Sequence, residues 1–213
     1  VGHALVAHYC EHSDPVHKIS ILPRGLALGY TLQLPEQDRH LISRAELHDQ
    51  VAVLLGGRLA ENIIFNEIPS GASNDIERAT ELARSFVCKY GMSSKLGPRK
   101  YGNTREQVFL GRDYTDHSKD YSENTSLEID AEIRSVIDQG YDKAKSILEK
   151  HKNELVEMSK LLMEKEVIEA TEFIEILDRL NGRLASGSVD KSDKDKQDIM
   201  PADQDTSKAT LEG

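Results

Sequence analysis

The chain has 213 residues, of which 38% are hydrophobic, 30% are charged and 5% are aromatic. This composition is typical of a soluble, helix-rich domain with an appendage. The 27 basic and 37 acidic residues give a formal net charge of -10, which disfavours nucleic acid and anionic lipid as partners. No apolar run reaches the roughly 20 residues of a membrane helix, so we expect no membrane contact by this chain itself. Cys10 and Cys88 form no CxxC pair, and we expect two buried or half-buried free thiols.

The first 35 residues predict a short helix followed by two strands. Residues 1–12 have apolar residues at helical spacing and indicate the end of a helix. Residues 17–22 and 26–34 alternate between apolar and polar side chains on either side of a turn at 23–25. Gly29, within the second predicted strand, indicates a bulge or a close approach of another backbone.

A long amphipathic helix follows. Ser43 and Glu46 have the spacing of a capping box, which predicts that the helix begins there. Its predicted buried stripe consists of six aliphatic side chains: Leu47, Val51, Leu54, Leu55, Leu59 and Ile63. Gly56 and Gly57 each cost the helix about 1 kcal/mol relative to alanine. We therefore expect another backbone to pack closely against this glycine pair.

A third helix is predicted from a second capping signature, Asn74 and Glu77, to Gly91, which ends it. Residues 92–122 are polar and contain glycine, proline and serine, so we expect a long loop there.

The remainder of the folded part is predicted to be all helical. A cap at Thr125 opens one helix, a junction near His151 separates it from a second, and Gly182 closes a third. The heptad spacing of three leucines allows two interpretations, ordinary bundle core or a coiled-coil seam: Leu148, Leu155 and Leu162. We therefore predict a mainly α fold, with a small β-element near the N-terminus and a C-terminal helical bundle. Residues 184–213 are acidic, bury almost nothing and are expected to be disordered.

Six blocks of sequence resemble the protease domain of the FtsH family, the membrane-anchored AAA zinc metalloproteases, in unchanged order: VGHALVAHY, DPVHKISILPRG, GGRLAE, SGASND with the AT that follows, KYGMSSKLG and VFLGRD. The resemblance extends from Val1 to about Arg183. It implies a peptidase domain over 1–183, divided into a zinc-site portion, 1–122, and a helical bundle, 123–183.

The resemblance also implies a metal site. In that family the first block reads HExxH; Val1 and Gly2 match the two variable positions, and His3 matches the second histidine. Two histidines at i and i+4 lie on one helix face and can share one Zn²⁺, while the glutamate takes a proton from the zinc-bound water. The first histidine and this general base would precede Val1, so we expect no catalytic residue within the chain itself. Asp75 matches the family's third ligand; the alternative is an ordinary acidic residue at a helix start.

Further roles are implied for four residues. Glu61 would accept a hydrogen bond from a ligating histidine; the alternative is an exposed helical glutamate. Leu28, Gly29 and Tyr30 belong to the strand that would pair with substrate backbone; the alternative is an ordinary amphipathic strand.

The other histidines predict no convincing second site. His8 and His12 lie four residues apart and could in principle hold a metal, but no third ligand is suggested. We expect four more histidines at the surface: His40, His48, His117 and His151.

At the level of function, the resemblance implies a zinc-dependent endopeptidase that degrades unfolded or membrane proteins in protein quality control. An AAA module outside this chain would use ATP and Mg²⁺, and the parent protein would act as a membrane-anchored homo-hexamer. The wording of the DPVHKISILPRG block indicates the cytoplasmic side of a bacterial inner membrane. The competing hypothesis is a catalytically inactive helical assembly module, because the first histidine and the glutamate are absent from the chain.

Overall fold

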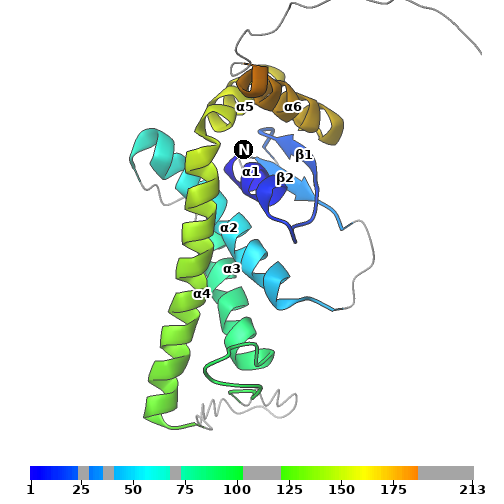
Figure 1. Cartoon of the computed structure of the whole chain (residues 1–213). Helices are drawn as coiled ribbons and strands as arrows, with labels where there is room; N and C mark the ends of the chain where they lie inside the picture. The colour runs from blue at the N-terminus through cyan, green and yellow to red at the C-terminus, as the bar shows by residue number, and fades with distance from the viewer. Residues whose placement is uncertain (24–28, 36–40, 68–72, 103–120, 187–213) are drawn as a thin grey trace, which may run out of the picture.

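The computed structural model describes residues 1–23, 29–35, 41–67, 73–102 and 121–186. The predicted mainly α fold with a small β-element is confirmed (Figure 1). The elements, in chain order, are α1 (Gly2–Tyr9), β1 (Val16–Ser20), β2 (Tyr30–Gln33), α2 (Arg44–Phe65), α3 (Ser73–Arg84), the π-helical turn η2 (Ser85–Lys89), α4 (Glu123–Lys150), α5 (Lys152–Lys165), β3 (Val167–Glu169) and α6 (Ala170–Ser186). None of the described helices has both the length and the apolar content needed to cross a membrane.

The three strands form one antiparallel sheet in the order β2-β1-β3. Ile19 of β1 is the central residue of the register, since it pairs with Thr31 of β2 and with Ile168 of β3. β2 therefore lies at an edge of the sheet. Figure 1 shows the sheet beside α1, with α5 and α6 at one end of the long helix α4.

The two strands β1 and β2 are shorter than the predicted strands 17–22 and 26–34. Residues 24–28, which include most of the predicted turn and Leu28, lie outside the described part of the chain. A Cβ atom at Gly29 would lie 2.7 Å from the carbonyl oxygen of Ser20. Gly29 thus permits a close backbone approach, as predicted, while the irregularity of the sheet lies between Val16 and Lys18 of β1.

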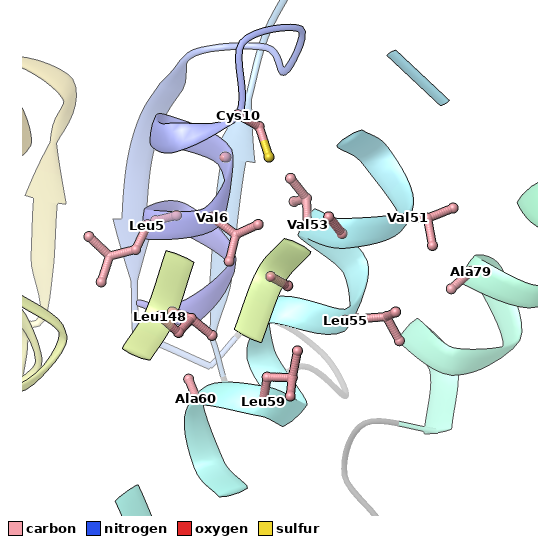
Figure 2. Close-up of a cluster of buried hydrophobic side chains, with 14 of the residues drawn as sticks. Leu5, Val6, Cys10, Val51, Val53, Leu55, Leu59, Ala60, Ala79 and Leu148 are labelled. Carbon is pink, nitrogen blue, oxygen red and sulfur yellow. The ribbon is translucent and has the colours of Figure 1, made fainter. Parts of the chain in front are cut away.

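α2 lies at the centre of the fold, and its predicted start is confirmed. The Ser43 hydroxyl accepts a hydrogen bond from the Glu46 amide (3.1 Å), and the Glu46 carboxylate accepts one from the Ser43 amide (3.2 Å). Four members of the predicted stripe are buried: Leu47, Val51, Leu55 and Leu59. The other two, Leu54 and Ile63, are partly buried against the same core. Figure 2 shows α2 side chains among those of α1, α3 and α4.

The predicted close packing at the glycine pair is also confirmed. A Cβ atom at Gly2 of α1 would lie 2.5 Å from the carbonyl oxygen of Gly56, and one at Gly56 would lie 2.9 Å from Val6 Cγ2. These contacts leave no room for side chains between the two backbones. The cost of glycine within α2 is therefore offset by the close approach of α1.

Two predicted helix starts are wrong. α3 already includes Ser73, so Asn74 lies within the helix instead of capping it. α4 begins after Ser122, whose hydroxyl accepts the amide of Thr125 at 3.2 Å. The predicted cap at Thr125 was displaced because Ser122 satisfies a free amide one turn earlier.

The predicted ends of these segments have mixed outcomes. α3 and η2 together reach Lys89, and Gly91 follows with φ +59°, a conformation that ends a helix as predicted. Residues 91–102 contain no helix or strand, which agrees with the predicted loop; 103–120 lie outside the described residues. α6 continues through Gly182 to Ser186, so the predicted stop at Gly182 is wrong.

The C-terminal helices share one core with the first half of the chain. His151 is the junction between α4 and α5, as predicted, and three leucines around it are buried in this core: Leu148, Leu155 and Leu162. α4 packs along α2, where a Cβ atom at Gly140 would lie 2.6 Å from Val51 Cγ1. The bundle and the N-terminal portion are thus packed as one body. From residue 187 onward, the predicted acidic tail lies outside the described residues.

Candidate metal centre

The two predicted metal ligands lie next to each other in the structure. His3 is on α1 and Asp75 is in the first turn of α3, and the distance from His3 Nε2 to Asp75 Oδ2 is 3.3 Å. Their side chains are 31% and 30% exposed. The pair is therefore held by two packed helices and remains accessible from solvent.

A hydrogen bond to the main chain fixes the orientation of the His3 ring and turns Nε2 toward Asp75. His3 Nδ1 lies 2.8 Å from the main-chain carbonyl oxygen of Val53 on α2. A carbonyl oxygen can only accept, so Nδ1 carries a proton. Nε2 is then the nitrogen that faces Asp75; a proton on Nε2 would donate to the carboxylate, and a bound metal ion would take the place of that proton.

Asp75 is ionised at neutral pH. The hydrogen bond with His3 is the main cause that lowers the pKa of the Asp75 carboxyl, while burial opposes this effect and the charge of Arg78 assists it. Its position in the first turn of α3 also favours a negative charge, since the helix dipole is positive there. A deprotonated oxygen beside a neutral imidazole is a donor set that suits Zn²⁺.

The spacing of the pair fits a shared metal ion. Zinc ligands bind at about 2.0–2.2 Å, so two ligands at tetrahedral angles are about 3.3–3.5 Å apart. The 3.3 Å between His3 Nε2 and Asp75 Oδ2 falls at this value. In the described part of the chain, no group of three or more His, Cys, Asp or Glu residues could hold a metal ion. The pair thus has the spacing that two ligands of one zinc ion would take.

Glu61 does not contact His3 through the hydrogen bonds of the structure, because the partner of His3 Nδ1 is Val53. Glu61 is exposed near the C-terminal end of α2. Sequence reasoning missed the role of Val53 because a main-chain carbonyl carries no signature in the side chain. The predicted hydrogen bond between Glu61 and a ligating histidine is thus not made with His3.

The predicted substrate strand lies at the sheet edge. Tyr30 is half-buried at the start of β2, whereas Leu32 and Leu34 are 38% and 45% exposed. Ile21 and Leu22, which follow β1, are exposed to a similar degree. Exposed apolar side chains thus occur at both ends of the β1–β2 pair, because Ser20 pairs with Tyr30 at one end and Val16 pairs with Gln33 at the other.

His8 and His12 do not form a metal pair. α1 ends at Tyr9, so His12 is no longer on the helix. The His8 ring instead packs edge-on against Tyr9 and Phe173. His12 lies against Asp49 in α2, where its amide donates to Asp49 Oδ2 at 3.1 Å.

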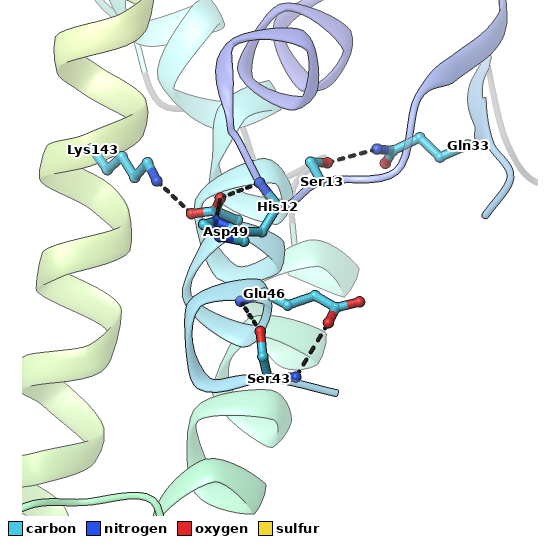
Figure 3. A network of polar contacts seen from close by, with 7 residues as sticks. All are labelled: His12, Ser13, Gln33, Ser43, Glu46, Asp49 and Lys143. Atoms are coloured by element: carbon cyan, nitrogen blue, oxygen red, sulfur yellow. Dashed lines mark hydrogen bonds and ion pairs between the residues drawn. The ribbon is translucent and has the colours of Figure 1, made fainter. Parts of the chain in front are cut away.

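Asp49 is the centre of a second polar site, which we call the closed cluster and define as Asp49, His12 and Lys143 (Figure 3). The Asp49 side chain is 2% exposed. One carboxylate oxygen accepts from the Lys143 ammonium of α4, and the other accepts from His12. The cluster ties the segment after α1 and the middle of α4 to α2, and it has no counterpart in the sequence prediction.

Two of the histidines predicted at the surface are packed against aromatic rings. The His151 side chain is only 13% exposed, stacks on Tyr9 with ring centres 3.7 Å apart and lies 2.8 Å from the buried Glu154 carboxylate. His48 packs edge-on against Phe86, and burial lowers the pKa of its imidazole. His40 and His117 lie outside the described residues.

The chain was compared with known proteins. The family model described as Peptidase family M41 matches residues 1–176. The chain is similar to proteins named "ATP-dependent zinc metalloprotease FtsH" from Pseudothermotoga lettingae (53% identical, 83% of this chain, 28% of the relative), Thermotoga maritima (48%, 83% and 29%) and Acidobacterium capsulatum (44%, 96% and 32%). The chain spans less than a third of the length of these relatives.

Proposed function

The chain belongs to peptidase family M41, and from this premise we propose that it is the zinc-dependent endopeptidase domain of a longer, ATP-dependent protease. The observation that carries the proposal is the pairing of His3 Nε2 with the Asp75 carboxylate at 3.3 Å. These residues would be two of the three zinc ligands. The bound metal would polarise the peptide carbonyl and lower the pKa of an attacking water.

In this mechanism, the residues of the chain orient and hold the site. Val53 would keep the His3 ring in the tautomer that leaves Nε2 free, and the lowered pKa of Asp75 keeps it anionic. In a longer protein, the HExxH residues that precede Val1 would supply the first histidine and the general-base glutamate. One helical turn of α1 upstream of His3 would bring that histidine to the same helix face.

We assign Glu61 to that upstream histidine on the basis of how α1 and α2 run past each other. A Cβ atom at Gly2, at the start of α1, would meet both Gly56 and Ala60 of α2. Val6, one turn later on α1, lies close to Gly56. Earlier residues of α1 thus lie beside later residues of α2. Gly57 lies beside His3, and Glu61 is one turn further along α2. The Glu61 carboxylate would therefore accept a hydrogen bond from a ligand one turn before His3.

For the substrate, we propose an unfolded polypeptide that pairs with the edge strand β2 at Tyr30 and with Gly29 before it, together with Leu28, which lies outside the described residues. Strand β2 occupies an edge of the sheet, and backbone pairing recognises many sequences because it ignores side-chain identity. The exposed apolar side chains Leu32 and Leu34 would add contacts that favour unfolded segments.

The wider context of the domain is also part of the proposal. The relatives are named ATP-dependent and are more than three times as long as the matched region. A nucleotide-dependent module that unfolds substrate, a membrane anchor, a homo-hexamer and a location on the cytoplasmic side of a bacterial inner membrane are the features we expect of the parent protein. The peptidase domain would extend over 1–183 and on to the end of α6 at Ser186.

The test is a zinc assay on the longer protein that includes the HExxH residues. We expect about one zinc per chain and hydrolysis of an unfolded polypeptide, both lost in His3→Gln because a ligand is removed. His12→Gln is the matched control, since His12 belongs to the closed cluster and should leave zinc in place. A parent protein that retains no zinc and cleaves nothing would reject the proposal in favour of an inactive assembly module.

A further inference from the structure

We infer that Gly57 is a positioning residue for the proposed metal site, because only glycine at this position leaves room for the His3 imidazole. The inference rests on the proposed function, in which His3 ligates zinc. It concerns a residue of α2 that is neither a ligand nor a hydrogen-bond partner of one.

The space above Gly57 is filled by the His3 ring. A Cβ atom at position 57 would overlap His3 Nε2 and would lie 2.6 Å from Cε1 and 3.0 Å from Cδ2. Non-bonded heavy atoms are comfortable at about 3.5–4.0 Å. All three of the nearest atoms belong to this one ring, so a side chain at 57 and the ring in its present position exclude each other.

The ring cannot relieve this overlap without losing its role. Its Nδ1 is bound to the carbonyl of Val53, one turn earlier on α2, at 2.8 Å. The contact with Gly57 and the bond to Val53 hold the ring against the same face of α2. A tilt away from position 57 would break the Val53 bond and would move Nε2 relative to Asp75, which lies 3.3 Å away.

A retreat of helix α1 as a whole would relieve the overlap only by opening the packed contact between α1 and α2. Gly2 and Gly56 are already in close contact, with a Cβ at Gly2 only 2.5 Å from the Gly56 carbonyl oxygen. The two adjacent glycines of α2 thus have different roles. Gly56 lets the backbones of α1 and α2 approach, whereas Gly57 makes room for the side chain that the proposed metal needs.

The main experiment compares alanine substitutions at three helical glycines in the longer protein. Gly57→Ala should weaken zinc retention against a chelator by about 10- to 100-fold, the range for loss of a ligand's supporting contact. Gly140→Ala is the matched control, because its new methyl group would meet Val51 and the Ala52 amide, not His3. It should lower the melting temperature and keep zinc affinity per folded molecule. Gly56→Ala, whose methyl group would meet Val6 and the Gly2 carbonyl oxygen of α1, should lower the melting temperature by separating α1 from α2.

A second readout does not involve metal. In the zinc-free protein, ¹⁵N resonances of the His3 imidazole should report a protonated Nδ1 in the parent and in Gly140→Ala. In Gly57→Ala this tautomer preference should be lost, because the bond to Val53 is broken. Unchanged zinc affinity and unchanged His3 resonances in Gly57→Ala would overturn the inference and leave the proposed function intact.

A double-mutant cycle tests the same contact if Gly57→Ala is too unstable to load with zinc. When His3 is also replaced by alanine, the ring is gone, and the destabilisation by Gly57→Ala should disappear. Destabilisation that persists in the His3→Ala background would overturn the inference. If the parent binds no zinc, the proposed function fails, and this cycle still decides whether Gly57 makes room for His3.

Discussion

Two aspartates lie beside α1, one near each end, and they differ in how completely they are enclosed. Asp75 faces His3 near the start of α1 and is 30% exposed. Asp49, in the closed cluster beyond the end of α1, is 2% exposed, and both of its oxygens have partners in the protein. A buried and fully paired carboxylate serves the fold, whereas a half-exposed carboxylate beside an oriented imidazole remains able to bind a metal.

The largest effect is expected from a substitution in the His3–Asp75 pair. Asp75→Asn in the longer protein should abolish zinc retention and proteolysis, because an amide is a much weaker zinc ligand than a carboxylate. Helical content measured by circular dichroism should be unchanged, since Asp75 is a half-exposed residue of the first turn of α3. An Asp75→Asn enzyme that is active and loaded with zinc would remove Asp75 from the ligand set.

The opposite result is expected in the closed cluster. Asp49→Ala should lower the free energy of unfolding by about 3 kcal/mol, because Lys143 and the His12 amide lose a buried acceptor. Zinc affinity of the molecules that remain folded should be retained. Urea denaturation with parallel zinc titration separates the two quantities, and an Asp49→Ala protein as stable as the parent would contradict this assignment.

Alkaline pH should weaken the core beside the closed cluster. Burial, assisted by the charge of Asp49, raises the pKa of the Cys10 thiol to about 11. Below pH 9 the thiol is neutral in both states; above it the unfolded chain ionises first, so stability falls as pH rises toward 11. The loss should be about 3 kcal/mol, at about 1.36 kcal/mol for each of two pKa units, and Cys10→Ala should remove it from the pH dependence of urea unfolding.

The smallest expected effect is a gain in stability, from a substitution at Gly182. Gly182 lies within α6, is exposed, and a Cβ atom there would meet nothing within 4 Å. Gly182→Ala should therefore raise the free energy of unfolding by about 1 kcal/mol through helix propensity alone. Zinc content should not change, which contrasts with the same substitution at Gly57. A Gly182→Ala protein with a lower melting temperature would contradict this description of α6.

Much of the fold was predictable from local signals. The capping box at Ser43 and the periodic stripe after it predicted α2. The glycine pair predicted a close backbone neighbour, which in the structure is α1. The predicted helix ends were wrong where more than one residue could cap or end the helix. Ser122 and Thr125 are both competent caps, and the helix propensity lost at one glycine is too small to end α6 at Gly182.

The candidate site was predictable in its side chains but not in its supports. His3 and Asp75 were identified through motifs that resemble a known family, and the structure brings them to 3.3 Å. The carbonyl of Val53 has no sequence signature, and Asp49 in the sequence is indistinguishable from an exposed helical acid. Both roles arise from tertiary packing of α2 against α1 and α4, which periodicity alone does not specify.

The most direct test of the central claim is a crystal structure of the zinc-loaded longer protein, with anomalous scattering recorded at the zinc edge. We expect one strong peak between His3 Nε2 and Asp75 Oδ2, about 2.0–2.2 Å from each. A zinc peak elsewhere, with His3 still hydrogen-bonded directly to Asp75, would contradict it.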